Sequence, residues 1–197
     1  MRIKITIAGT VPLLCARFTD EAAQKASAGN RTSAAAGDRG TPLEIAEAAL
    51  YKGLDGKPML PQPNVLRCLV DGGRFFKAGK KQITTKEESL LYGCLDIEET
   101  EIQIKHKQPW KVDTRAVVIP ATKGRILAHR PMFDDWELTF VADLDTSVLG
   151  EKLFREIVDA AGKRIGLGAF RPAKKGPYGR FVVKSWQELK VSLRDAA

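Results

Sequence analysis

A strict alternation of large apolar side chains near the middle of the chain constrains the fold more than any other feature. Trp136, Leu138, Phe140, Ala142 and Leu144 are separated from one another by single residues that are mostly polar. Successive side chains of a β-strand point to opposite faces of its sheet, so this spacing predicts a strand with one buried face. The chain therefore has to build a sheet with one covered face.

The segment that follows has the period of a helix. Its apolar residues between 148 and 158 recur at helical spacing, which predicts an amphipathic helix over 147–161. Thr146 or Ser147 is a suitable N-cap for this helix. Gly162 is a suitable end, because glycine tolerates the backbone conformation found after the last turn of a helix.

Further elements are expected by the same criteria. Residues 2–8 alternate isoleucine with polar residues and predict a half-buried strand. Strands are also expected at 95–107, at 112–120 and, to close the fold, at 180–186. A second helix is expected from Asn64 to about Phe76, followed by a basic loop.

An insertion is predicted after the first strand. Residues 19–40 lack large apolar side chains, so they cannot offset their ordering entropy by burial, and we expect a mobile loop. Thr41 and Glu44 have the spacing of a capping box and start a short helix. A hairpin turning at Asp55-Gly56 follows. Together these pieces make an insertion over 19–60.

With the insertion set aside, the order of elements is strand, helix, strand, strand, helix, strand. This order predicts an α+β fold with a ferredoxin-like, RRM-like β-α-β-β-α-β core. Residues 1–197 are expected to form a single domain of this kind. The aromatic signature on the third strand of the RNA-recognition module is missing here. Base stacking on the open sheet face is therefore not expected.

The stretch from Lys163 to Arg180 has the composition of a nucleic-acid-binding loop. Its 18 residues contain six cations, no anions, four glycines, two prolines and two aromatic residues. Cations contact phosphates, aromatic rings stack on bases, and glycine lets the backbone approach a ligand closely. A solvated turn is the alternative interpretation. The candidate binding residues are Lys163, Arg164, Gly166, Gly168, Phe170, Arg171, Lys174, Lys175, Tyr178 and Arg180.

A second basic block lies between residues 105 and 130, where Asp113 is the only acidic residue. Residues 123–131 within it are expected to form a loop or a hairpin tip that reaches a phosphate backbone. The net charge of +8 likewise favours a polyanionic partner. The candidate binding residues of this block are Lys105, Lys107, Lys111, Lys123, Arg125 and Arg130.

No cofactor, metal site or catalytic group is expected. His106 and His129 have no partners at metal-ligand spacing, and the three cysteines lie far apart, as structural thiols do. The first residues alternate instead of forming an apolar signal core, and no apolar run approaches the ~18 residues of a membrane span. The sequence therefore predicts a cytoplasmic protein without a membrane partner.

Three features resemble the RAMP superfamily of CRISPR-associated proteins, and within it the backbone subunit that coats guide RNA. The first strand is followed by a long insertion. Residues 55–61 (DGKPMLP) then lead into a helix carrying Leu66-Arg67, similar to the family pattern G-x-P-x-I-P-(x)n-L-(K/R). Finally, helix 147–161 runs into Ile165-Gly-Leu-Gly168 and Gly179-Arg-Phe181, like the family's glycine-rich loop before its last strand.

This resemblance implies an RRM-like core, binding along a guide-RNA backbone and head-to-tail self-association. It also implies contacts with other effector-complex subunits in antiviral defence. Type III backbone subunits carry a target-cleaving Asp in the loop after the first strand. Asp20 and Asp38 lie in the corresponding insertion, but neither sits in a recognisable motif, so no catalytic residue is carried over.

Four functions remain open at this stage. The leading hypothesis is a protein that coats single-stranded RNA through phosphate contacts. A phage or bacterial single-stranded-DNA-binding or annealing protein would use the same residues. An endoribonuclease of this fold would rely on His106 or His129, although its family typically has a histidine shortly after the first strand. A self-assembling structural protein would use only complementary acidic and basic faces.

Overall fold

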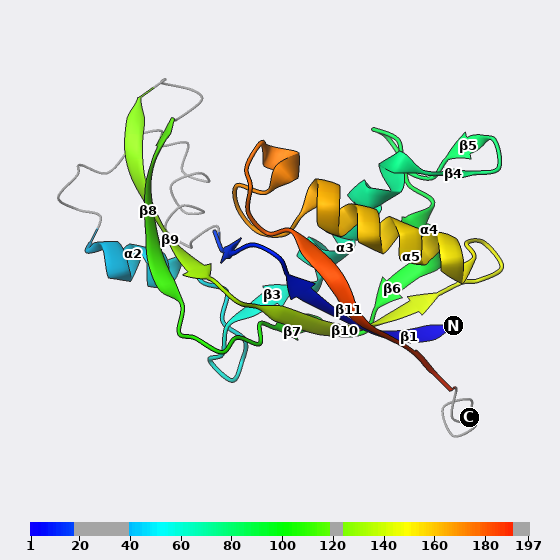
Figure 1. The fold of residues 1–197 in the computed structure, drawn as a ribbon, viewed down its shortest axis with the longest axis horizontal. Helices are drawn as coiled ribbons and strands as arrows, with labels where there is room; N and C mark the ends of the chain where they lie inside the picture. The colour runs from blue at the N-terminus through cyan, green and yellow to red at the C-terminus, as the bar shows by residue number, and fades with distance from the viewer. Residues whose placement is uncertain (18–39, 119–123, 191–197) are drawn as a thin grey trace, which may run out of the picture.

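The computed structural model describes residues 1–17, 40–118 and 124–190 (Figure 1). Its centre is a four-stranded antiparallel sheet in the order β11-β1-β10-β6. Two helices lie together on one face of this sheet (Figure 1). The sheet strands are β1 (Arg2–Gly9), β6 (Leu95–Ile97), β10 (Glu137–Leu144) and β11 (Phe181–Leu189), and the covering helices are α3 (Gln62–Gly72) and α5 (Glu151–Ala160).

The alternating segments form strands as predicted. On β1, Ile3, Ile5 and Ile7 are at most 1% exposed, and on β10 the residues from Leu138 to Leu144 alternate between buried and half-buried or exposed. Burying a large aliphatic or aromatic side chain stabilises a fold by roughly 1.5–3 kcal/mol, so these two central strands anchor the core. The alternation therefore decides which face meets the helices.

The opposite face of the sheet is polar. Thr6 and Thr139 share a hydrogen bond of 3.1 Å between their hydroxyl groups, and the guanidinium of Arg2 donates to the carboxylate of Glu98. Lys4 stands exposed on the same face of β1. This surface offers paired polar groups instead of aromatic rings.

The predicted start of helix 147–161 is wrong, whereas its α-helical part ends at Ala160, one residue from the predicted end. The helix begins at Glu151, because the carboxylate of Asp145 accepts hydrogen bonds from the amide and the hydroxyl of Ser147 and holds that segment in a turn. At the other end the chain continues as a π-helical turn, η3 (Ala161–Ile165), and stops at Gly166 with φ of 72°. Gly162 instead packs against Phe181, where a Cβ has no room.

The predicted strand at 95–107 divides into two strands of different sheets. Its first part is β6, and its second part is β7 (Glu101–Gln103), which pairs with β3 (Met59–Pro61). Between them the carboxylate of Glu99 accepts hydrogen bonds from the backbone amide of Val141 at 2.8 and 3.1 Å. This bend lets one segment serve two sheets.

The region before α3 follows the sequence prediction closely. The capping box of Thr41 and Glu44 is present at the start of α2 (Pro42–Ala48). The hairpin turn at Asp55-Gly56 is confirmed by a β-bridge between Lys52 and Pro58. Most of the predicted mobile loop lies outside the residues that the structure describes.

The second helix is confirmed with a different start and end. α3 begins at Gln62, two residues before the predicted Asn64, and passes into a short 3-10 turn, η2 (Gly73–Phe75). The basic segment that follows is a small hairpin of two-residue strands, not a loop. The hairpin strands are β4 (Lys77–Ala78) and β5 (Lys81–Gln82), and α4 (Leu91–Cys94) precedes β6.

A long β-hairpin projects from the body of the molecule (Figure 1). Its first strand confirms the prediction at 112–120 as far as residue 118. Residues 125–131 were expected to be a loop or tip, and this is wrong, because they form part of a nine-residue strand. Lys123 lies outside the described residues. The strands are β8 (Lys111–Val118) and β9 (Arg125–Phe133), with β2 (Leu13–Leu14) pairing along β9.

One hydrophobic core connects these parts. It includes Leu50 and Leu60, which come from the predicted insertion, together with the central strands and both covering helices. Cys15, Cys68 and Cys94 are buried in it as free thiols. None of the described helices has the length and apolar character needed to cross a membrane.

Candidate nucleic-acid interface

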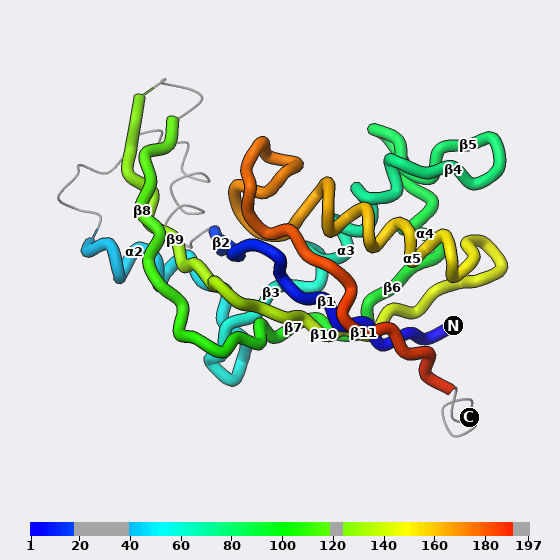
Figure 2. Tube along the Cα trace, in the orientation of Figure 1, coloured from blue at the N-terminus to red at the C-terminus, as the bar shows by residue number. Residues whose placement is uncertain are grey.

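The glycine-rich loop is held in one shape by backbone hydrogen bonds. The amide of Leu167 donates to the carbonyl of Gly179 at 2.9 Å and closes the loop on itself. The amide of Ala169 donates to the carbonyl of Leu14 at 2.7 Å and ties the loop to β2. Figure 2 shows the loop, in orange, beside the blue end of β2. The loop is therefore a preformed surface in this structure.

The glycines of this loop have a packing role. Gly168 and Gly179 have φ of 73° and 69°, in the left-handed region that favours glycine. A Cβ at Gly168 would overlap the carbonyl of Leu14, and one at Gly179 would overlap the carbonyl of Leu167. These glycines allow chain segments to approach each other, and the predicted approach of Gly166 and Gly168 to a ligand stays a prediction.

Arg115 of β8 joins the hairpin to the loop. Its Nε donates to both carboxylate oxygens of Asp113, at 2.9 and 2.8 Å. Its guanidinium lies 4.7 Å from the ring centroid of Tyr178 and donates to the hydroxyl of that tyrosine. The hydrogen bonds to Asp113 and the charge of its carboxylate raise the pKa of Arg115, and burial opposes them only in part. Hairpin and loop therefore form one continuous surface.

The two aromatic residues of the loop differ in availability. The rings of Phe170 and Tyr178 are 6.1 Å apart and tilted by 42°. Tyr178 is half-buried under Arg115, whereas Phe170 is 40% exposed. Phe170 is therefore the better placed of the two for stacking on a base.

The strand register determines which hairpin cations face the loop. Arg130 pairs opposite Asp113, so its side chain projects from the same hairpin face as Arg115. Arg125 pairs opposite Val118 near the tip, on the other face. Of the predicted cations on β9, Arg130 is the one on the loop side.

The lysines at 105–111 lie at the base of the hairpin, at the opposite end from its tip. Lys111 forms an ion pair of 2.6 Å with Asp134, and the backbone amide of Lys107 donates to Asp135. Lys105 pairs with β10 through its backbone. This cluster contains carboxylates, so the structure does not bring these three lysines into the basic surface of the loop.

The remaining cations of the loop differ in their surroundings. Arg164 turns toward η2, with its guanidinium 4.6 Å from the ring centroid of Phe75. Lys174, Lys175 and Arg180 are exposed on the loop itself. Arg171 is half-buried and donates to the carbonyl of Gly168, and Lys163 is exposed at the end of the helix.

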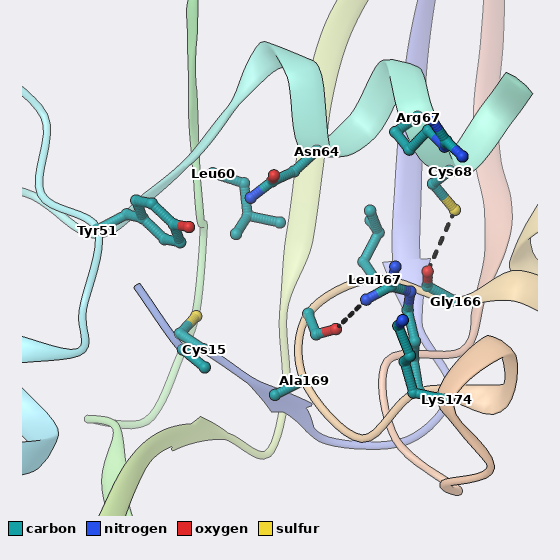
Figure 3. Close-up of a pocket in the computed structure, with 13 residues that line it drawn as sticks. Cys15, Tyr51, Leu60, Asn64, Arg67, Cys68, Gly166, Leu167, Ala169 and Lys174 are labelled. Atoms are coloured by element: carbon teal, nitrogen blue, oxygen red, sulfur yellow. Dashed lines mark hydrogen bonds between the residues drawn. The ribbon is translucent and has the colours of Figure 1, made fainter. Parts of the chain in front are cut away.

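A pocket of about 340 Å³ opens beside the loop (Figure 3). Four parts of the chain line it: the residues after β2, Tyr51 and Leu60 on either side of the Asp55-Gly56 hairpin turn, the first turns of α3, and residues 166–174. Sequence reasoning missed it because these segments are far apart in the chain, although the Leu66-Arg67 motif marked one of them. The lining residues outside the loop are Cys15, Ala16, Tyr51, Leu60, Asn64, Arg67 and Cys68.

The thiols at this pocket are neutral. Burial raises the pKa of Cys15 and of Cys68 to about 12. The Sγ of Cys68 also donates to the carbonyl of Gly166 at 3.3 Å. A thiol is nucleophilic only as its thiolate, so these two groups contribute uncharged lining.

The two histidines have local partners. Nδ1 of His106 lies 2.8 Å from the carbonyl of Gln108, and Nδ1 of His129 lies 2.8 Å from the hydroxyl of Thr114. Within the part of the chain that the structure describes, no three His, Cys, Asp or Glu side chains are grouped to hold a metal ion. Asp20 and Asp38 lie outside that part.

Comparison with known proteins finds similar folds but no similar sequences. No protein-family model matches the chain, and no curated protein sequence does. A chain in the cryo-EM structure of the type III-B Cmr-beta complex bound to cognate target RNA superposes with a TM-score of 0.53 at 13% identity. That match covers 94% of this chain and 59% of the other.

A chain of a type IV-B CRISPR complex superposes with a TM-score of 0.50 at 14% identity, covering 98% of this chain and 94% of that one. This chain thus has the fold of CRISPR-complex subunits. The resemblance to the RAMP superfamily predicted from the sequence motifs implies a fold of this kind, and these superpositions show the fold alone. The chain spans 59% of the length of the type III-B chain.

Proposed function

We propose that this protein is an RNA-binding subunit of a CRISPR-type ribonucleoprotein. It would hold single-stranded RNA by its phosphates on the surface made by the glycine-rich loop and the facing side of the β8–β9 hairpin. The observation that carries this proposal is the contact between Arg115 and Tyr178, which joins two basic segments distant in sequence. The shared fold with chains of CRISPR complexes supports it.

The architecture supports a ferredoxin-like core in one domain. In chain order the sheet strands are β1, β6, β10 and β11, and their spatial order places the fourth beside the first and the third beside the second. Helix α3 follows the first strand and α5 follows the third, as in the β-α-β-β-α-β arrangement. We interpret residues 19–60 as an insertion into this single domain.

The charge of the loop suits phosphates better than a protein partner. Lys174, Lys175 and Arg180 are exposed on a stretch that contains no acidic residue. Each phosphate contact that releases a counterion makes binding weaker as salt rises. The loop should therefore supply a salt-dependent component of affinity that does not depend on base sequence.

The test is fluorescence anisotropy with a short single-stranded RNA over a range of salt concentrations. We expect Lys174→Ala/Lys175→Ala/Arg180→Ala to weaken binding and to reduce the salt slope by about 2, since each single-strand contact contributes about 0.7. The matched control, Lys77→Ala/Lys80→Ala/Lys81→Ala, removes three exposed cations from the β4–β5 region. Equal effects of the two triple variants would contradict the site.

The same assay separates RNA from DNA. A DNA strand of identical sequence lacks the 2′-hydroxyl, which is the group that distinguishes the two at a given site. We expect tighter binding of RNA. Tighter binding of DNA would assign this surface to a single-stranded-DNA-binding protein instead.

We also propose that copies associate head to tail along the bound RNA in the cytoplasm, with other effector subunits at the ends. The projecting hairpin carries exposed apolar side chains, with Val118 54% and Leu127 60% exposed, which is typical of a contact surface. Light scattering with RNAs of increasing length should show mass rising in steps of one protomer. A single protomer on every RNA length would refute this assembly.

A further inference from the structure

We propose that the pocket between α3, the end of β2 and the glycine-rich loop binds one nucleobase of the RNA strand. This inference rests on the proposed function, because it places the base beside the surface that holds the phosphates. The pocket lies within the range of roughly 300–1,000 Å³ that ligand sites occupy. Its volume is about 340 Å³.

The walls of the pocket suit the flat faces of a base. Leu60 and Leu167 supply apolar surface, and the ring of Tyr51 stands at one side (Figure 3). The thiols of Cys15 and Cys68 are neutral, so the lining presents no negative charge to a nucleotide. A base gains from burial here because its two faces are the least polar parts of RNA.

The polar groups of the pocket suit the edge of a base. The side chains of Asn64 and Tyr51 point into the same space above Cys15 and Ala169 (Figure 3). Within the described part of the chain, neither the amide of Asn64 nor the hydroxyl of Tyr51 has a hydrogen-bond partner. An amide offers two donor hydrogens and one acceptor oxygen, so it can pair with the acceptors and donors along the edge of a base.

The cations at the mouth of the pocket suit the phosphate of the same nucleotide. Arg171 and Lys174 line the pocket from the loop. One N–H of Arg171 donates to the carbonyl of Gly168 at 2.8 Å, which holds the guanidinium in place. Arg67 also lines the pocket, but it already forms an ion pair with Asp71 along α3.

The loop connects this pocket to the phosphate-binding surface. Lys174 belongs to both, because it lines the pocket and is exposed beside Lys175. An RNA strand crossing the loop would therefore pass the mouth of the pocket. Turning one base out of the strand costs least in single-stranded RNA, where no base pair has to be broken.

The experiment compares a short single-stranded RNA with the same oligonucleotide in abasic form. We expect Asn64→Ala to weaken binding of the normal RNA by about 5- to 150-fold, the range of one good amide–base contact. Binding of the abasic RNA should not change. Tyr51→Phe, which removes only the hydroxyl, should act in the same direction.

The control is Gln187→Ala, which removes an exposed side-chain amide from β11. Gln187 pairs with Lys4 near the end of β11 that is farther from the glycine-rich loop. It should leave binding of both RNAs unchanged. Asn64 lies in the first turns of α3, where alanine has a higher helix propensity, so the variant is expected to fold. Circular dichroism checks this point.

The outcomes separate the two proposals. No RNA binding by the unmodified protein would refute the proposed function itself. Equal binding of normal and abasic RNA, with no effect of Asn64→Ala, would overturn the nucleobase pocket while leaving phosphate binding intact. Asn64-dependent binding of a free nucleoside monophosphate, without any effect on RNA, would overturn the assignment to the RNA strand.

Discussion

Replacing Arg115 by methionine should destabilise the protein through Asp113. The carboxylate of Asp113 is 9% exposed and bonds the Nε of Arg115 at 2.8 and 2.9 Å, and the guanidinium covers the Tyr178 ring. Leaving a buried acceptor unpaired costs about 1–3 kcal/mol, and the lost cation–π contact adds about 0.5–1 kcal/mol. Arg115 is itself 39% exposed, so solvent screens part of its electrostatic interaction with Asp113. We therefore expect Arg115→Met to lower the free energy of unfolding by about 2 kcal/mol.

The second half of the test removes the carboxylate as well. In Arg115→Met/Asp113→Asn no charge remains buried, so the double variant should be more stable than Arg115→Met alone. Urea denaturation of the unmodified protein, both single variants and the double variant gives the coupling free energy from a double-mutant cycle. We expect coupling of about 1 kcal/mol or more.

Additive single effects would refute this reasoning. Additivity would mean that Arg115 and Asp113 act independently and that the side chains do not position each other. The same variants also test the surface proposed for RNA. Arg115→Met should weaken binding of an RNA long enough to contact both loop and hairpin, whereas a very short RNA that contacts the loop alone should be less affected.

Three further predictions follow from the local structure. The backbone amides of Lys107 and Gln108 help to lower the pKa of Asp135. The stability that this carboxylate contributes is therefore present above the unfolded pKa near 3.9 and is lost as the pH falls through the lower folded pKa. Denaturation over a pH series should show the stabilities of Asp135→Asn and the unmodified protein converging in acid. Gly168→Ala should lower the free energy of unfolding by at least about 1–2 kcal/mol in urea denaturation, because residue 168 has a φ of 73°. A Cβ added at Gly93 would enter open space, so Gly93→Ala should change the free energy of unfolding little. The buried thiol of Cys68, with a pKa of about 12, should react with iodoacetamide only when the protein unfolds, and rapid labelling of the native protein would contradict its placement.

The strands with strict alternation were predictable because their pattern follows directly from burial. Every second residue of β1 and β10 is buried, so an amphipathic strand is the only regular structure that fits. β9 was missed for the opposite reason. Its residues from Arg125 to Arg130 are all exposed or half-buried, so no alternation of polarity marks them, and pairing with β8 alone makes them a strand.

The basic loop was predictable as a candidate surface, but its internal contacts were not. Composition identifies cations and aromatic residues without saying which of them are already engaged. Tyr178 has Arg115 as a partner and Arg164 has Phe75, whereas Lys174 and Lys175 remain exposed. These differences arise from segments that are distant in the chain, so no local pattern reports them.

The sequence by itself determined which faces of the central strands are buried, the capping box at Thr41 and the basic character of the loop. Only the tertiary structure decided that the segment at 95–107 serves two sheets and that Cys15, Asn64 and Leu167 line one pocket. The physical reason is that periodicity reports local burial, which depends on a few neighbouring residues. A pocket depends on how the folded sheet brings its loops and helices together.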